Sequence, residues 1–257
     1  MNTQLILSLI SGLLISSAAA YLGTLMLSKK MSVVAGPLAH LAFPGVALAI
    51  VYHFSFALGV FPFVIFGAIL IWFLEKKTKL PMENLTAVIF AFGVGTSLLF
   101  LPIDQAEEAL VGNIMKISGW ETAMVTVLSV LVYLSVKRIY KKMILININE
   151  EIAIAKKINV SFYNLVYLLS IAVVVALGVY LVGGLITVAL IAIPAGASRN
   201  ISRSLPEYKF WAVVIGAVGT VLGILFSQAW GLPAGPTIIV IEAIIFSMSL
   251  VFKLSQK

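Results

Sequence analysis

The amino-acid sequence predicts an all-α polytopic bundle of transmembrane helices. Of its 257 residues, 61% are hydrophobic and 11% are charged, whereas about a quarter of the residues in a soluble domain are charged. The chain contains no cysteine, which excludes a disulfide-stapled module and a cysteine-based metal cluster. Apolar runs of membrane-spanning length recur along the whole chain. We therefore expect one membrane-embedded domain over residues 1–257.

Nine apolar runs, separated by charges, predict nine transmembrane helices. A helix needs about 20 residues to cross the hydrocarbon core. The first run has no basic residue before it and is too long for the apolar part of a signal peptide, so we interpret it as a span. The runs cover residues 4–28, 32–54, 55–74, 84–101, 122–136, 162–181, 183–198, 210–229 and 235–252.

The basic residues predict the orientation of these spans. Cytoplasmic loops collect Lys and Arg, and alternating spans place sixteen of the seventeen basic residues on one side, leaving only Lys116 on the other. The sixteen are Lys29, Lys30, Lys76, Lys77, Lys79, Lys137, Arg138, Lys141, Lys142, Lys156, Lys157, Arg199, Arg203, Lys209, Lys253 and Lys257. The N-terminus is then outside and the C-terminus inside. The net charge of +7 is a topology signal and requires no nucleic-acid partner.

The outer segment over residues 102–121 is acidic. It carries Asp104, Glu107, Glu108 and Glu121. Such charges most often belong to a surface loop whose side chains face solvent. Alternatively, like charges at the mouth of a cleft form a vestibule that attracts cations. Both interpretations remain open at the level of the sequence.

The inner loop near residues 147–159 predicts a short amphipathic helix. Asn147 is a candidate N-cap with Glu150 three residues later, and Lys156 and Lys157 fall in the last turn, where they complement the helix dipole. One face would carry Ile148, Ile152, Ala155 and Ile158. Such a helix is either a connector at the membrane interface or a docking element. Because no GxxxxGK[ST] sequence occurs, any nucleotide would be bound by another subunit.

Two ionisable residues lie deep within the predicted spans. His40 precedes Pro44 by one helical turn, and a proline there removes the N–H that would bond the His40 carbonyl. With Gly36 nearby, this helix is expected to be broken, as happens in membranes where a helix is buried or lines a cavity. His40 either bonds a neighbouring helix or marks an ion pathway, and Glu242 is either an interhelical donor or a pathway carboxylate.

Four segments together resemble the metal-type (ABC-3) family of ABC transporter permeases. The first is GPLAHLAFPGVALA at 36–49, similar to the family's G-D-x-L-S-H-x-x-L-P-G-[VI]-A. The others are LVGNIMKIS at 110–118, IPAGASR at 193–199 and GILFSQAWGLPAGPTI at 223–238. They occur in the family's order and spacing, and the resemblance covers nearly the whole chain.

The resemblance implies a permease subunit for zinc, manganese or iron in a prokaryotic plasma membrane. It implies pairing with a second permease copy and with two cytoplasmic ATPase subunits, and delivery of metal by an external binding protein. The permease itself would be no enzyme: ATP would be bound by the partner, and the metal would be cargo rather than a resident cofactor. The stretch Glu151, Ile152, Ala153, Ile154 and Ala155 resembles the family's coupling segment E-L-A-R-A-x-G, with Lys157 in the place of glycine. Ile158 follows directly.

The sequence departs from the family at the metal path. Family members typically carry Asp four residues before the histidine, and here that position is Gly36. The metal would then bind His40 and a carboxylate from elsewhere, with Glu107, Glu108 and Glu242 as candidates. A weaker transit site and a different substrate stay open. The alternative function is an ion-coupled secondary transporter in which His40 and Glu242 form a relay.

Overall fold

The computed structural model describes residues 3–28, 35–100 and 114–255, and the regular elements within these ranges are all helical. The all-α prediction is confirmed. The helices are α1 (Thr3–Ser28), α2 (Ala35–His40), α3 (Phe43–Val51), α4 (Phe56–Thr78), α5 (Met82–Phe100), the 3₁₀ helix η2 (Ile114–Lys116), α7 (Gly119–Ile148), α8 (Glu150–Ala155), α9 (Val160–Val182), α10 (Gly184–Ile201), α11 (Leu205–Trp230) and α12 (Ala234–Ser255).

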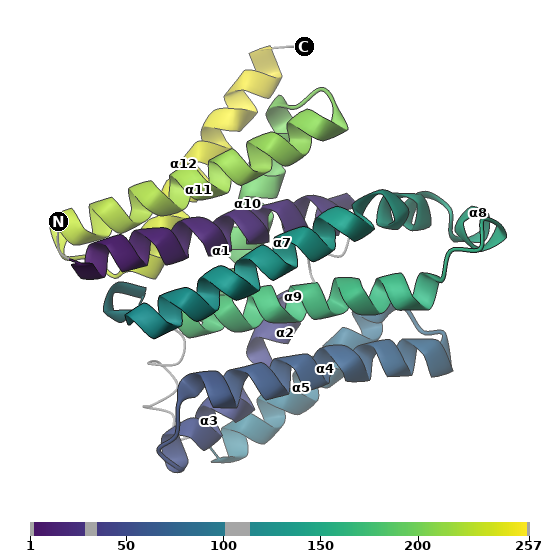
Figure 1. The fold of residues 1–257 in the computed structure, drawn as a ribbon, viewed down its shortest axis with the longest axis horizontal. Coiled ribbons are helices and arrows are strands. Elements are labelled where there is room, and N and C mark those ends of the chain that lie inside the picture. The colour runs from purple at the N-terminus through teal and green to yellow at the C-terminus, as the bar shows by residue number, and fades with distance from the viewer. Residues whose placement is uncertain (1–2, 29–34, 101–113, 256–257) are drawn as a thin grey trace.

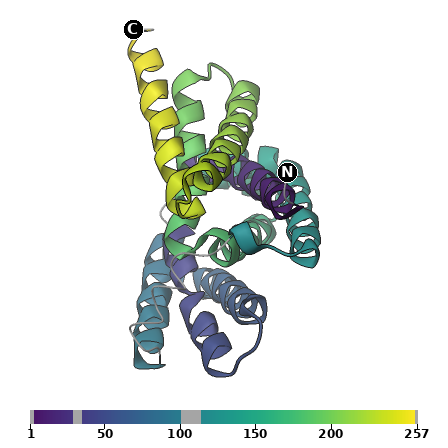
Figure 2. The ribbon, with the colours of Figure 1, turned by 90° about the vertical axis from the view of Figure 1, so that its left-hand side faces the viewer.

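Helices α1 and α9 form the centre of the bundle. α1 packs against α7, α10 and α11, while α9 packs against α4, α7 and α10. Helices α2 to α5 gather on one side of α9, and α10 to α12 gather on the other side of α1 (Figures 1 and 2). Of the six long apolar helices, α12 is the least buried. Only 22% of its apolar stretch is buried, compared with 72% in α9. The chain therefore has two peripheral groups joined by a buried centre.

All nine predicted runs contain helix within the described residues, and a turn divides the second run. Among the helices of the described ranges, six are long and apolar enough to cross a membrane, namely α1, α4, α7, α9, α11 and α12. α7 extends over 30 residues and continues well beyond the predicted run 122–136, because charged residues end an apolar run without ending a helix.

The second predicted run forms two helices. α2 ends at His40, residues 41 and 42 form a turn, and α3 begins at Phe43 with Pro44 in its first turn. A proline is accepted in a first helical turn, where no intrahelical partner awaits its missing N–H, and it disfavours helix in the residue before it. The predicted helix break is confirmed, and it is a complete interruption.

The predicted boundaries of the inner helix are wrong. α7 continues through Ile148, and Asn149 rather than Asn147 caps α8, since its side chain accepts a hydrogen bond from the Ile152 N–H at 3.0 Å. α8 ends at Ala155, so the two lysines follow the helix. Lys157 has φ of 58°, and the Lys157 and Ile158 N–H groups donate to the carbonyls of Ile154 and Ala153. This is a Schellman ending, in which glycine is the usual residue at the position of Lys157.

Candidate functional site

His40 is the last residue of α2, directly before the interruption, and lies beside two aromatic rings. Its ring centroid is 5.0 Å from that of Phe43 and 5.1 Å from that of Phe90 on α5, both in edge-on geometry. The side chain is half-buried. At the end of α2, the Leu41 and Ala42 N–H groups donate to the carbonyls of Pro37 and Ala39. Pro44 has no N–H to donate to the His40 carbonyl, and a free carbonyl beside the imidazole stays a prediction.

A close helix contact fixes the interruption in place. A Cβ atom built on Gly45 of α3 would lie 2.1 Å from the Gly59 carbonyl oxygen of α4, and one built on Gly59 would lie 2.2 Å from the Gly45 oxygen. Only glycine allows two backbones to approach so closely. α3 is therefore held against α4, immediately after the turn at residues 41 and 42 that follows His40.

Gly36 has free space around it. Among the described residues, a Cβ atom built there would meet only Val188 Cγ2 on α10, at an ordinary 3.7 Å. Gly36 and His40 are four residues apart in α2, and side chains at this spacing lie on one face of a helix. Packing does not explain why glycine replaces the family's aspartate.

Glu242 lies in the other peripheral group of helices. It is fully buried in α12, and its Cγ would be 2.7 Å from a Cβ atom built on Gly219 of α11. Neither carboxylate oxygen has a hydrogen-bond partner among the described residues. The structure does not bring Glu242 and His40 together, because His40 packs against Phe43 and Phe90 while α12 packs against α10 and α11.

The acidic outer segment is only partly described. Asp104, Glu107 and Glu108 lie outside the described residues. Glu121 is described, and its side chain bonds to protein: Oε2 accepts from the Ser118 N–H at 2.7 Å and Oε1 accepts from the Tyr180 hydroxyl. With Ser118 as N-cap, this completes a capping box at the start of α7. Within the described ranges, no group of three or more His, Asp or Glu side chains is arranged to hold a metal ion.

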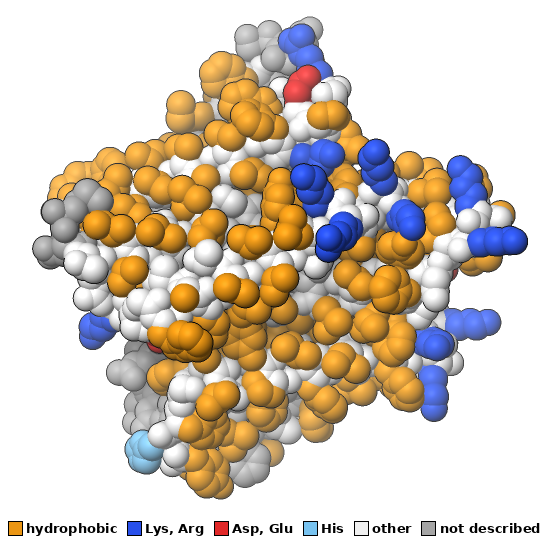
Figure 3. Space-filling model, viewed as in Figure 1, with side chains coloured by type: hydrophobic (Ala, Val, Ile, Leu, Met, Phe, Trp, Pro, Cys, Tyr) orange, Lys and Arg blue, Asp and Glu red, His pale blue; other side chains and the backbone are white. Residues whose placement is uncertain are grey.

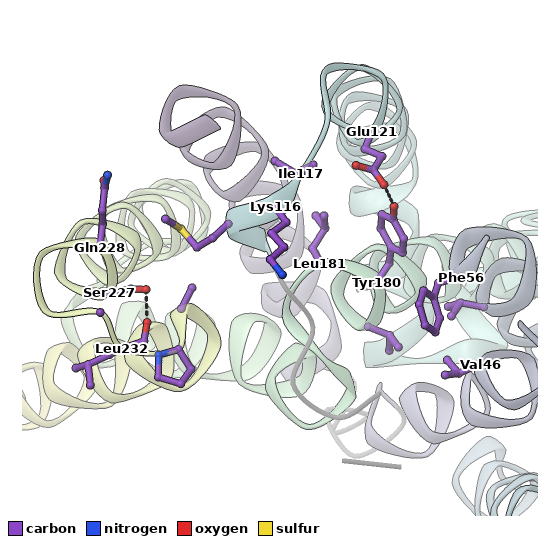
Figure 4. A pocket seen from close by; sticks show the side chains of 16 residues that line it. Val46, Phe56, Lys116, Ile117, Glu121, Tyr180, Leu181, Ser227, Gln228 and Leu232 are labelled. Atoms are coloured by element: carbon purple, nitrogen blue, oxygen red, sulfur yellow. Dashed lines mark hydrogen bonds between the residues drawn. The ribbon is translucent and has the colours of Figure 1, made fainter. Parts of the chain in front are cut away.

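A half-open cavity of about 980 Å³ lies near Glu121 (Figure 4). It is enclosed by η2, the start of α7, the end of α9, parts of α3 and α4, and the connection from α11 to α12. Its walls are mostly apolar, and its polar side chains are Lys116, Glu121, Tyr180, Ser227 and Gln228. Sequence reasoning placed Lys116 and Glu121 on the outer side without predicting this cavity.

The residues predicted for ATPase coupling divide between two environments. Glu151, Ile152 and Ala155 are exposed on α8, whereas Ala153 is buried and Ile158 packs against the core. α8 lies at the end of the molecule opposite the N-terminus (Figure 1). Ile154, which lies within the same stretch that resembles the family's coupling segment, is also exposed, at 58%.

Two further neighbours of the predicted groups were missed. Phe90 sits in an apolar run whose other members look like it, so nothing in the sequence marked it as a neighbour of His40. Tyr180, which bonds Glu121, lies near the end of an apolar run, where tyrosines are common at membrane interfaces. That position was a usable signal.

A protein-family model described as the ABC 3 transport family matches residues 1–253. The chain belongs to the ABC 3 transport family. The resemblance predicted from four short segments is thereby confirmed over nearly the whole chain. Together with its apolar helices, this family membership makes the protein a multi-pass membrane protein.

Relatives in this ABC 3 family match over most of their length. The manganese transport system membrane protein MntC of Listeria innocua is 23% identical over 253 residues, covering 97% of this chain and 90% of the relative. The high-affinity zinc uptake system membrane protein ZnuB of Haemophilus influenzae is 25% identical, covering 95% of each chain. The manganese import system permease protein ScaB of Streptococcus gordonii is 22% identical, covering 94% of this chain and 88% of the relative.

A solved structure shares the fold. A chain of PsaBC from Streptococcus pneumoniae in complex with Fab superposes with a TM-score of 0.81 at 21% identity, covering 96% of this chain and 91% of that chain. At this identity the likeness establishes the ABC 3 fold alone. The relatives are named as membrane or permease proteins, which agrees with the prediction of a permease subunit rather than an ATPase.

Proposed function

We propose that this chain is the membrane-spanning permease subunit of an ATP-driven importer for a divalent transition metal: zinc, manganese or iron. The structural observation that carries the proposal is the interrupted helix within a predicted span, with His40 as the last residue of α2 and Pro44 in the first turn of α3. The names of the family relatives, which refer to manganese and zinc transport, support the choice of cargo.

In this proposal His40 is a transit ligand for the metal. A neutral imidazole suits zinc and iron, and oxygen donors suit manganese. A transit site has to release its ion, so one imidazole with main-chain oxygens is a reasonable donor set. Glu107 and Glu108 remain predicted ligands in the outer segment. Glu242 also remains a predicted metal ligand. It could meet the metal only if α12 moved relative to α2, because α10 packs against both helices.

We further propose nine spans, with the N-terminus outside and the C-terminus inside. Lys and Arg side chains gather toward the end of the bundle that carries α8, and hydrophobic side chains cover much of the remaining face (Figure 3). This distribution supports the orientation derived from the positive-inside rule. The cavity beside Glu121 then opens to the outside, where an external binding protein would deliver the metal.

α8 is the proposed docking element for a cytoplasmic ATPase. It presents Glu151, Ile152, Ile154 and Ala155 to solvent, while Ala153 and Ile158 fasten it to the bundle. ATP would be bound and hydrolysed in the partner. Movement of α8 would be passed through α7 and α9, which it contacts, so that the His40 region opens first to one side and then to the other. A second copy of the permease would complete the transporter.

Uptake by cells tests the function directly. The gene is expressed with and without its ATPase partner in cells that lack their own metal importers, and uptake of zinc, manganese and iron isotopes is compared. We expect uptake of at least one metal that requires both proteins. Uptake that persists fully without any ATPase would instead support the ion-coupled secondary transporter.

A paired substitution tests the docking surface. Ile152→Ala combined with Ile154→Ala should reduce co-purification of the ATPase, because it removes the exposed apolar side chains of α8. Phe92→Ala is the control, since Phe92 is an apolar residue on a different helix and is more exposed, at 72%, than Ile152 at 47% and Ile154 at 58%. Unchanged co-purification of the ATPase with the double variant would refute the assignment of α8.

A further inference from the structure

The proposed docking element α8 is joined to α9 by a short, hydrogen-bonded connection. Only residues 156–159 separate the two helices. The Lys157 and Ile158 N–H groups donate to carbonyls of α8, and the Asn159 side chain caps α9 by accepting a hydrogen bond from the Phe162 N–H at 3.1 Å. A displacement of α8 is therefore passed to the first turn of α9.

The first turn of α9 is hydrogen-bonded to the last turns of α4. The Trp72 indole N–H donates to the Ser161 carbonyl at 2.9 Å and lies 3.1 Å from the Ser161 hydroxyl oxygen. One turn further along α9, the buried Asn164 amide donates to the Glu75 carboxylate at 3.5 Å. Figure 1 shows α8, the start of α9 and the end of α4 at the same end of the molecule. Because a buried donor without a partner is costly, the start of α9 and the end of α4 should move together.

α4 also contacts the turn that follows His40. Leu41 is the first residue of this turn, and its side chain is buried. A Cβ atom built on Gly67 of α4 would lie 2.6 Å from Leu41 Cδ1, and one built on Gly93 of α5 would lie 2.8 Å from Leu41 Cδ2. The leucine side chain thus fills the space between two glycines. Gly67 lies about 7.5 Å along the helix from Trp72, in a stretch without proline, so both contacts belong to one continuous segment of α4.

We propose that α4 transmits the movement of α8 to His40, with Trp72 and Leu41 as positioning residues, an inference that rests on the proposed metal-import function. Close-packed interiors transmit a displacement because they contain few voids that could absorb it. A shift of α9 moves α4 through Trp72, and α4 moves the turn that carries Leu41. The imidazole of His40 directly precedes this turn and follows it. Hydrolysis of ATP in the partner is thereby linked to the exposure of His40.

The amount of metal taken up per ATP hydrolysed tests this transmission. The permease is reconstituted in lipid vesicles with its ATPase and the external binding protein, and uptake of a zinc, manganese or iron isotope is measured together with ATP hydrolysis. The variants are Trp72→Phe, which keeps an aromatic ring but removes the indole N–H, Leu41→Ala, and the two combined. Trp211→Phe is the matched control, because Trp211 lies on α11, which packs against α1, α10 and α12.

The proposal predicts a loss of coupling rather than a loss of ATP hydrolysis. The ratio of metal to ATP should fall by about twofold to tenfold in Trp72→Phe and in Leu41→Ala, on the scale by which residues between coupled sites change their coupling. The double variant should lose no more than the more affected single variant, because both residues act in one path. Trp211→Phe should keep the ratio of the wild type. If Leu41→Ala fails to insert, Leu41→Val takes its place and should lower the ratio in the same direction.

An unchanged ratio in Trp72→Phe would overturn the transmission through α4, even if uptake and hydrolysis fell together, since a purely structural loss of working complexes lowers both rates in proportion. Losses that multiply in the double variant would place Trp72 and Leu41 on separate routes and overturn it as well. Both outcomes leave metal import standing. If the wild type with its ATPase takes up none of the three metals, the proposed function itself fails.

Discussion

His40 and Glu242 are both ionisable side chains within predicted spans, yet they differ in burial and in the regularity of the helix that carries them. His40 sits where the helix is interrupted, half-buried, between two aromatic rings. Glu242 sits in an uninterrupted helix, fully buried, against a glycine. The neighbours of the His40 ring are the rings of Phe43 and Phe90, whereas the Glu242 carboxylate has no hydrogen-bond partner among the described residues.

This difference shows which polar groups in a membrane can serve a passing ion. A ligand has to exchange partners, which requires access and alternative donors, and an interrupted helix supplies both. A carboxyl group enclosed by close helix packing can exchange nothing until the helices separate. We therefore expect substitutions in the α2–α3 region to change transport strongly. Substitutions in the α11–α12 region should mainly change the stability of the fold. The following experiments test that division.

The largest effect is expected from His40→Ala. It removes the only imidazole in the α2–α3 region and should lower metal uptake to background, a loss of about 100-fold or more, since even indirect partners of metal ligands cost about 10- to 100-fold. Isotope uptake measures the loss, and the amount of protein in the membrane serves as the control. Normal uptake by an inserted variant would remove His40 from the pathway.

Glycine substitutions compare how the two regions are packed. Gly45→Ala drives a Cβ atom against the backbone of Gly59, which cannot move alone, whereas Gly219→Ala meets the side chain of Glu242. Both should destabilise the protein, by about 1–3 kcal/mol for overpacking, with Gly45→Ala the more severe. The measurement is the apparent unfolding midpoint in detergent.

Gly95→Ala provides the control for this pair. A Cβ atom on Gly95 meets no described residue within 4 Å, and alanine favours a helix over glycine by up to about 1 kcal/mol. Its midpoint should be unchanged or higher. If Gly219→Ala proved more damaging than Gly45→Ala, the α11–α12 contact would be the tighter one.

Gly36→Asp tests whether the α2–α3 region can accept a carboxylate. The free space beside Val188 accommodates the larger side chain, and the new carboxylate would share a helix face with His40. We expect KM for metal uptake to fall about threefold to tenfold and release to slow, because a second hard ligand strengthens the site. Uptake kinetics separate the two effects. An unchanged KM would show that the cargo does not pass between these positions.

The sequence predicted much of the fold because composition dictates it. Apolar runs locate spans reliably, since an unsatisfied backbone is too costly in lipid for any other structure. The helix break at Pro44 followed from its missing N–H. The predicted helix boundaries failed where two similar residues competed: Asn149 rather than Asn147 caps α8, because α7 continues through Ile148, well beyond the predicted run.

The site was less predictable than the fold. His40 was identified because histidine is rare in a span, but Phe90 was not, since it lies fifty residues away in a run of similar apolar side chains. The burial of Glu242 depends on Gly219, and no pattern in the sequence pairs them. The cavity beside Glu121 is assembled from several helices that are distant in the chain. Such proximity is a property of packing, which a periodic pattern does not contain.

The smallest change in transport is expected from Glu242→Met. Methionine has a similar length and no group that needs a hydrogen bond, so it removes a buried polar group without a partner, whose cost is about 1–3 kcal/mol. The unfolding midpoint should therefore rise, while metal uptake should stay within about twofold of the wild type. Thermal unfolding in detergent and isotope uptake are measured on the same preparation. A stable, inserted variant that has lost uptake would show that α12 does separate from α11 during transport and that Glu242 then meets the ion. In that case the α11–α12 region would belong to the pathway together with His40.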